Sequence, residues 1–291
     1  MGLPRLSLAL QEPAELNRTW RASVGPPLWR GRQGDGYDLV IEQGVSGDLL
    51  FTYGDHARFR LAPDMERLDC APNRPGPDWQ RILLGKVVPS VSVMRGYEAL
   101  HSAVIDYPDG VVAIMGPSGS GKSTLAAEML SRGCSLFADD QLTLDQPDGT
   151  VRAHCGTPHM NLAEELPGEL DAEALGTTLS RIAGERWLVA NSTTPSLFRP
   201  VRLLCLLERG AGLNLEAHSL PLNPLLLAPY MLGLSIDAER QRSRFCLYAD
   251  LMESATLVRV TAGLEHRPEQ LADSIGQVLQ STREMTTENI S

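Results

Sequence analysis

The chain has 291 residues, of which 43% are hydrophobic and 21% are charged, and its formal net charge is −10. These proportions are typical of a globular protein with a sizeable core, and they exclude a disordered or fibrous chain. An acidic chain without a basic stripe repels the phosphate backbone of DNA and RNA. We therefore expect no nucleic-acid partner.

The five cysteines are widely spaced and form no CxxC pair, which favours buried thiols over a disulfide framework or a zinc site. The apolar run at residues 225–232 is too short to cross a bilayer and contains a proline. The first residues match neither a secretory nor a myristoylation signal. We expect a cytoplasmic protein without a membrane partner, and self-association into a homo-oligomer stays open.

Short apolar runs separated by Gly, Pro and Asp predict a small, mostly β region over residues 1–95. The expected strands are residues 39–41, 49–51, 57–61 and 82–84. Residues 70–78 hold three prolines and a glycine, so we expect a surface loop there.

Residues 96–285 predict an α/β domain, because wholly apolar segments alternate with longer helical patterns. The buried strands expected are residues 111–115, 135–138, 201–207 and 257–260, in a sheet covered on both faces. Residues 286–291 are expected to form a frayed polar tail.

Three helices are expected in this domain. The first covers residues 123–132, buries Leu125, Ala126, Met129 and Leu130, and stops at Gly133. The second is capped by Asp237 and presents Phe245, Tyr248, Leu251 and Met252 inward. The third begins at Pro268, with Leu271, Ile275, Val278 and Leu279 on one face.

Residues 116–123 fit the Walker A motif G-x-x-x-x-G-K-[ST] at every fixed position, between an expected strand and an expected helix. Glycines let such a loop turn its N–H groups around a polyphosphate, and the helix adds its positive dipole end. The Lys122 ammonium would contact the β- and γ-phosphates, and the Ser123 hydroxyl would bind Mg²⁺. The alternative is a Gly/Ser-rich connection that binds nothing. The expected nucleotide contacts are Gly116, Pro117, Ser118, Gly119, Ser120, Gly121, Lys122, Ser123 and Thr124.

Asp139 and Asp140 directly follow an expected strand, so they would lie at the sheet edge where α/β proteins hold ligands. Two carboxylates there can bind Mg²⁺ and accept a proton from a hydroxyl group. The alternative is an acidic turn that only ends a strand. His101 precedes the loop and could reach the phosphates, although a lone histidine is more often structural. We do not expect His154, Cys155 and His159 to bind a metal, since no second Cys/His pair accompanies them.

Four features in this order and spacing resemble the catalytic core of the HPr serine kinase/phosphorylase family. They are Leu100-His101-Ser102-Ala103-Val104, the loop at 116–123, Arg132-Gly133, and Phe137-Ala138-Asp139-Asp140. The resemblance is closer to HPr-kinase-related bacterial proteins that carry a small N-terminal β domain. It implies a P-loop α/β core similar to the nucleotide domain of phosphoenolpyruvate carboxykinase.

The resemblance also implies roles for single residues. Lys122 and Ser123 would bind phosphate and Mg²⁺, and His101 would line the site. Asp139 and Asp140 would share metal binding and general-base catalysis, and which of them does which stays open.

The chain departs from the family beyond Asp145, where residues 154–162 replace the glycine-rich signature associated with phosphorolysis. We therefore expect an Mg-ATP-dependent kinase whose acceptor is a serine of a peptide or small protein, such as a lasso-type precursor peptide. The alternatives are a kinase for a small hydroxylated metabolite, an HPr serine kinase, and an ATP-binding regulatory protein that transfers no phosphate.

Overall fold

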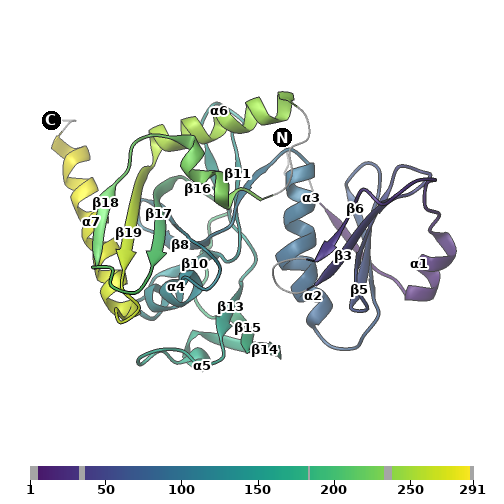
Figure 1. Ribbon diagram of the computed structural model, residues 1–291, viewed down its shortest axis with the longest axis horizontal. Coiled ribbons are helices and arrows are strands. Elements are labelled where there is room, and N and C mark those ends of the chain that lie inside the picture. Colours follow the sequence, from purple (N-terminus) through teal and green to yellow (C-terminus); the bar gives the residue numbers. More distant parts are fainter. Residues whose placement is uncertain (1–5, 33–36, 183, 233–237, 289–291) are drawn as a thin grey trace. The chain divides into compact units, whose positions relative to one another are not determined.

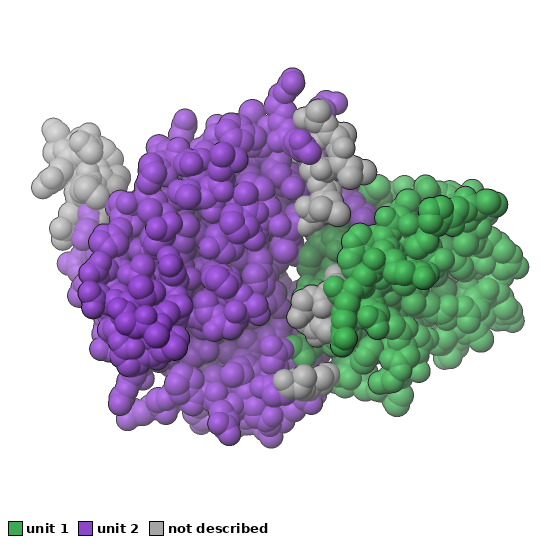
Figure 2. Space-filling view, in the orientation of Figure 1, with its two compact units in different colours: residues 1–91 green, residues 92–291 purple. Residues whose placement is uncertain are grey.

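The computed structural model describes residues 6–32, 37–182, 184–232 and 238–288. The chain divides into two compact units, Met1–Val91 and Ser92–Ser291 (Figures 1 and 2). Within the described ranges, no helix has the length and apolarity needed to cross a membrane.

The first unit is built on a six-stranded sheet in the order β1-β6-β5-β4-β3-β2. Its strands are β1 (Ser7–Leu10), β2 (Trp29–Arg32), β3 (Asp38–Gln43), β4 (Leu49–Tyr53), β5 (Ala57–Leu61) and β6 (Arg67–Pro72). Strands β2 to β6 pair antiparallel with their neighbours, and β1 runs parallel to β6. Phe51, Tyr53 and Phe59 form the centre of the core on one face. On the other face, Leu16 of α1 (Pro13–Thr19) packs with Leu50 and Ala71.

Residues 82–84 were expected to be a strand, but they lie in a helical stretch. It consists of α2 (Asp78–Ile82), the π-helix η1 (Leu83–Val87) and α3 (Val88–Met94). Ile82, Leu83, Val87 and Val91 are all buried in the core of the first unit. The three-residue apolar run is therefore part of a helical face, and a run this short cannot by itself distinguish a strand from a helix.

The expectation of a loop over residues 70–78 was also partly wrong. Cys70, Ala71 and Pro72 belong to β6, and Asp78 begins α2. Pro72 ends its strand beyond Cys70, the last residue paired with β1, where a missing N–H is tolerated. Only the residues between Pro72 and Asp78 form the connection.

The second unit contains a central sheet in the order β10-β8-β9-β17-β19-β18 (Figure 1). Its strands are β8 (Ala103–Tyr107), β9 (Gly110–Met115), β10 (Ser135–Ala138), β17 (Val201–Arg209), β18 (Glu216–Ser219) and β19 (Thr256–Ala262). Strands β9, β17 and β19 are parallel, and β8 is antiparallel to both β9 and β10. Strand β10 therefore points the same way as β9, and the carboxyl ends of β9, β10, β17 and β19 lie at one edge.

Both faces of this sheet are covered, as expected. Val112 and Ile114 of β9 pack in one cluster with α4 (Lys122–Ser131) and α7 (Pro268–Glu288), and a three-stranded sheet in the order β13-β15-β14 contributes to that cluster. Val111, Ala113 and Met115 pack in a second cluster with α6 (Ala238–Ser254). A four-stranded sheet in the order β16-β12-β11-β7 contributes to the second cluster. The predicted α/β class is confirmed.

The smaller elements of the second unit complete these layers. They are β7 (Glu98–Leu100), β11 (Leu142–Asp145), β12 (Arg152–His154), β13 (His159–Ala163), α5 (Ala172–Leu175), β14 (Gly176–Ile182), β15 (Glu185–Ala190), β16 (Phe198–Arg199) and the 3-10 helix η2 (Pro224–Tyr230).

The three predicted helices are present, with two corrections. Gly133 has φ of 94° just beyond α4, in keeping with its expected role as a stop. In α6, Phe245 is 52% exposed, because the buried stripe centres on Tyr248 and Leu251 and Phe245 lies at its margin. Helix α7 continues to Glu288, past the expected boundary at residue 285, because extending a formed helix needs no new nucleus. Asp237, the expected cap, lies outside the described residues.

Candidate active site

The glycine-rich loop connects Met115, the last residue of β9, to Lys122, the first residue of α4. Gly119 and Gly121 have φ of 77° and 90°, values that residues with a side chain rarely adopt. A Cβ on Gly116 would lie 2.6 Å from the Leu207 carbonyl oxygen. The backbone of the loop therefore requires glycine at these three positions.

The Lys122 side chain lies back over this loop. Its Nζ donates to the carbonyl oxygens of Gly116 at 3.0 Å and Pro117 at 3.1 Å, and the residue is only 8% exposed. Burial lowers the pKa of Lys122, and the charges of Asp140 and Asp139 oppose that shift. The ammonium group is therefore held between the loop and the paired acids.

Asp139 and Asp140 leave β10 at the same sheet edge as the loop. The Ser123 hydroxyl donates to Asp139 Oδ1 at 3.2 Å. Although part of Asp139 reaches solvent, protein atoms surround it closely, and this burial raises its pKa to about 7. The charge of Asp140 acts in the same direction, while hydrogen bonds from Asn161, Asp140 and Ser123 lower the pKa.

Asn161 of β13 binds both acids and was not identified from the sequence. Its backbone N–H donates to Asp139 Oδ2 at 2.8 Å, and its Nδ2 donates to Asp140 Oδ2 at 2.8 Å. Met160 and Leu162 on either side are buried in the core. A polar residue between two apolar ones in a strand was the signal in the sequence that could have indicated a position facing the site.

His101 lies beside the paired acids. Its Nδ1 is 3.0 Å from the backbone carbonyl oxygen of Asp140. Asp140 itself has φ of 65°, one of two non-glycine residues with positive φ within the described ranges. The structure thus brings together His101, Lys122, Ser123 and the two acids, all from the predicted set.

His154 and His159, which were considered above as metal ligands, contact other residues instead. His154 is 3.0 Å from Asp145 Oδ1 and packs edge-on against Phe198, while His159 stacks on Trp187. Within the ranges that the structure describes, no group of three His, Cys, Asp or Glu side chains could hold a metal ion.

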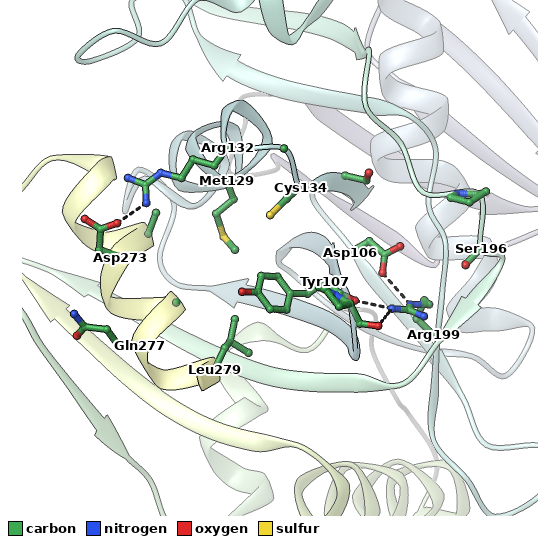
Figure 3. Close-up of a pocket in the computed structure, with 16 residues that line it drawn as sticks. Asp106, Tyr107, Met129, Arg132, Cys134, Ser196, Arg199, Asp273, Gln277 and Leu279 are labelled. Atoms are coloured by element: carbon green, nitrogen blue, oxygen red, sulfur yellow. Dashed lines mark hydrogen bonds and ion pairs between the residues drawn. The ribbon is translucent and has the colours of Figure 1, made fainter. Parts of the chain in front are cut away.

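A cavity of about 820 Å³ lies elsewhere, at the C-terminal end of α4 (Figure 3). Met129, Cys134 and Tyr107 point into it, and the ion pairs Arg132–Asp273 and Arg199–Asp106 lie at its margins. Helix α4 has ten residues and is about 15 Å long, and Lys122 is its first residue, at the opposite end from the cavity. The cavity is therefore distinct from the loop and the paired acids.

The residues at the loop suit a hard divalent cation. The Ser123 hydroxyl and the carboxylates of Asp139 and Asp140 are oxygen donors, which Mg²⁺ prefers, and Mg²⁺ usually completes its shell with water and phosphate oxygens. Ser120 Oγ and Asn161 Oδ1 are buried without a hydrogen-bond partner among the described residues. The loop and Asn161 therefore retain unused polar atoms of the kind that a ligand could satisfy.

The α/β core and the glycine-rich loop between a strand and a helix define a protein with P-loop architecture. Over 89 residues the chain is 39% identical to the HPr kinase/phosphorylase of Bordetella pertussis and 37% identical to that of Bordetella petrii. Each match covers 30% of this chain and 27% of the relative, so the chain spans about a quarter of the curated relatives' length. The expected similarity to HPr kinase/phosphorylases is confirmed over that segment.

No family model matches the chain. A solved structure, the HPr(Ser) kinase/phosphatase from Coxiella burnetii, aligns with a TM-score of 0.36 and 11% identity, covering 66% of this chain and 96% of the other.

Proposed function

We propose that the chain is an Mg-ATP-dependent kinase that transfers the γ-phosphoryl group of ATP to a hydroxyl acceptor. The observation that carries this proposal is the hydrogen bond between Ser123 and Asp139, which joins the glycine-rich loop to the paired acids. The sequence similarity to HPr kinase/phosphorylases supports it.

The two acids would have different roles. Asp139 shares a hydrogen bond with Ser123, so these two residues would hold Mg²⁺, which would neutralise charge on the phosphates. Asp140 Oδ2 accepts from Asn161, and its other carboxylate oxygen accepts no hydrogen bond from the described residues. Asp140 can therefore take the proton of the acceptor hydroxyl as general base.

Lys122 would exchange partners when nucleotide binds. Its Nζ now donates to two loop carbonyls, and a phosphate oxygen offers a charged acceptor, which forms a stronger hydrogen bond. The same ammonium would then neutralise the charge that develops on the transferred group.

For the acceptor, we propose a serine of a peptide or small protein, and a lasso-type precursor peptide is one candidate. The relatives are named for HPr, the protein on which they act. In this chain, residues 154–162 replace the glycine-rich signature that the resemblance to that family implies. A peptide acceptor other than HPr is therefore our preferred proposal.

The test is mass spectrometry of peptide and metabolite pools after incubation with ATP and Mg²⁺. Wild type is expected to give a phosphoryl-sized mass gain on one acceptor class, and Lys122→Ala is expected to give none. Lys86→Ala is the matched control, because Lys86 is the only other lysine of the chain and belongs to the first unit. Tight Mg-ATP binding without any mass gain would instead identify a regulatory protein.

Two further variants separate the acids. Asp140→Asn is expected to bind Mg-ATP normally and to lose turnover, whereas Asp139→Asn is expected to raise the Mg²⁺ concentration needed for ATP binding. Full activity of both variants would contradict the roles proposed above.

A further inference from the structure

The order of strands distinguishes two sides of the glycine-rich loop. The paired acids leave β10 on one side of β9, and β17 and β19 end on the other side. If the reacting phosphate lies near the acids, as in the proposed function on which this inference rests, the rest of the nucleotide must extend away from them. The carboxyl ends of β17 and β19 are the elements that lie in that direction.

Arg209, the last residue of β17, connects this region to the loop. Its Nη2 donates to three backbone carbonyls after β19: Gly263 at 2.8 Å, Leu264 at 3.1 Å and His266 at 2.7 Å. Its Nη1 lies 3.7 Å from the position that a Cβ on Gly121 would occupy. The Arg209 guanidinium group therefore extends from the glycine-rich loop to the segment that follows β19.

Arg209 also has an unused donor. Its Nε is buried and has no hydrogen-bond partner among the described residues. A buried donor without a partner is unfavourable unless a ligand or water satisfies it. A positive group in this position suits the anionic phosphates nearest the nucleoside.

Residues 263–266 present an apolar side chain at the same edge. Leu264 is 67% exposed, although Gly263 beside it is buried and Arg209 fixes its backbone. The turn is closed by a hydrogen bond from the His266 N–H to the Gly263 carbonyl at 3.2 Å. An exposed leucine on a fixed turn offers a flat apolar contact of the kind that a nucleobase can cover.

We propose that residues 263–266 form the nucleoside-binding wall of the site, with Leu264 against the base. Arg209 is the positioning residue that holds this wall next to the glycine-rich loop.

The test compares two ligands that share the phosphates and differ in the nucleoside. Binding of Mg-ATP and of inorganic tripolyphosphate with Mg²⁺ is measured by calorimetry for wild type, Leu264→Glu and Leu222→Glu. Leu222 is the matched control, since it is 62% exposed and follows β18. Strand β18 runs antiparallel to β19, so its carboxyl end lies at the opposite end of the strands from Leu264. Leu264→Glu is expected to weaken ATP binding about tenfold and to leave tripolyphosphate binding within about twofold of wild type. Leu222→Glu is expected to change neither.

Other outcomes are distinguishable. Unchanged ATP binding by Leu264→Glu, or equal weakening of both ligands, would overturn the nucleoside wall while leaving the proposed kinase intact. Wild type that binds neither ligand would overturn the proposed function and this inference together. Leu264→Ala is the second variant, and it is expected to weaken ATP binding in the same direction without adding a charge.

Arg209→Lys tests the positioning role. Lysine keeps the charge but cannot donate to three carbonyls and face the loop at once, so ATP is expected to bind more weakly relative to tripolyphosphate. Equal ATP binding by Arg209→Lys and wild type would contradict the role assigned to the guanidinium.

Discussion

Asn161 holds the two acids of the site through two separate donors, its backbone N–H and its side-chain amide. The amide is neutral, so it orients Asp140 without adding charge to a site that already contains two carboxylates. The backbone donor does not depend on the side chain. A substitution at residue 161 therefore changes the contact with Asp140 and keeps the contact with Asp139.

We predict that Asn161→Leu lowers turnover about tenfold, because Asp140 loses the hydrogen bond that orients it, and leaves Mg-ATP affinity nearly unchanged. The measurement is kinase activity beside calorimetric ATP binding. Asn191→Leu is the control, since that amide donates to the Ala174 carbonyl away from the acids. A loss of ATP binding equal to the loss of turnover would contradict a role confined to Asp140.

The sequence was sufficient to select the residues that lie close together along the chain. The loop and the acids are separated by one helix, and their motif is local. Asn161 and Arg209 reach the same site from β13 and β17, and only the pairing of strands brings them there. Arg209 carries no local signature, and the alternation around Asn161 indicates only that its side chain faces away from the core. The contribution of either residue to this site could therefore not be predicted without the topology.

Asp48 in the first unit gives a prediction for the dependence of stability on pH. Burial raises the pKa of Asp48, but hydrogen bonds from Ser46 and Arg60 and the Arg60 charge more than offset it, and the pKa is lowered. The stabilisation is therefore present above the pKa of Asp in the unfolded chain, about 4. It is lost as the pH falls through the lowered folded value.

We expect wild type to lose stability more steeply than Asp48→Asn as the pH is lowered from about 5 to 3. The measurement is urea unfolding of both proteins across that range. Asp64→Asn is the control, because Asp64 has no ion pair among the described residues and lies in an exposed turn. Parallel stability curves for wild type and Asp48→Asn would contradict the prediction.

Helix α4 is the element on which the site depends, because its first turn carries Lys122 and Ser123 while most of its length is buried. Its other end is joined to α7 by Arg132, whose guanidinium bonds to buried Glu128 at 2.6 Å, to Asp273 at 2.5 Å and to the Glu269 carbonyl at 2.9 Å. The orientation of α4 is therefore fixed at both ends.

Arg132→Ala is expected to lower the free energy of unfolding by about 1 to 2 kcal/mol, because Glu128 is left buried without its partner. This is less than for a fully buried pair, since the Arg132 side chain is 37% exposed. The measurement is chemical denaturation, with the double variant Arg132→Ala/Glu128→Gln as control. The double variant is expected to recover part of the lost free energy of unfolding. Equal stability of the single and double variants would contradict the idea that the unpaired Glu128 charge causes the loss.

At the scale of elements, the long patterns were predictable and the short ones were not. Strands β9 and β17 and helix α7 are specified by apolar residues over many positions. Residues 82–84 are a run of three, and their helical state depends on Val87 and Val91 packing in the same core. Likewise, the prolines around residue 75 indicated a loop correctly, but they could not show that β6 extends to Pro72.

The whole molecule consists of two units with separate cores, and every residue proposed for the site belongs to Ser92–Ser291. Phe59 is fully buried in the first unit, so Phe59→Ala is expected to destabilise that unit by about 3 kcal/mol. Mg-ATP is expected to raise the unfolding temperature of the second unit by the same amount with or without this substitution.

The measurement is differential scanning calorimetry of both proteins with and without Mg-ATP. The control is Leu125→Ala in α4. The Leu125 side chain is 1% exposed, so its loss is expected to destabilise the second unit directly. A large fall in the Mg-ATP shift of Phe59→Ala would show that the first unit contributes to binding.

The left-handed backbone of Asp140 has an evolutionary consequence. At φ of 65°, glycine would relieve strain of about 1 kcal/mol, yet glycine would remove the carboxylate that the proposed reaction uses. Selection for heat tolerance alone is therefore expected to replace Asp140 with glycine, whereas selection for activity is expected to retain it. The residue found at position 140 in laboratory-evolved descendants would thus record which of the two properties had been selected.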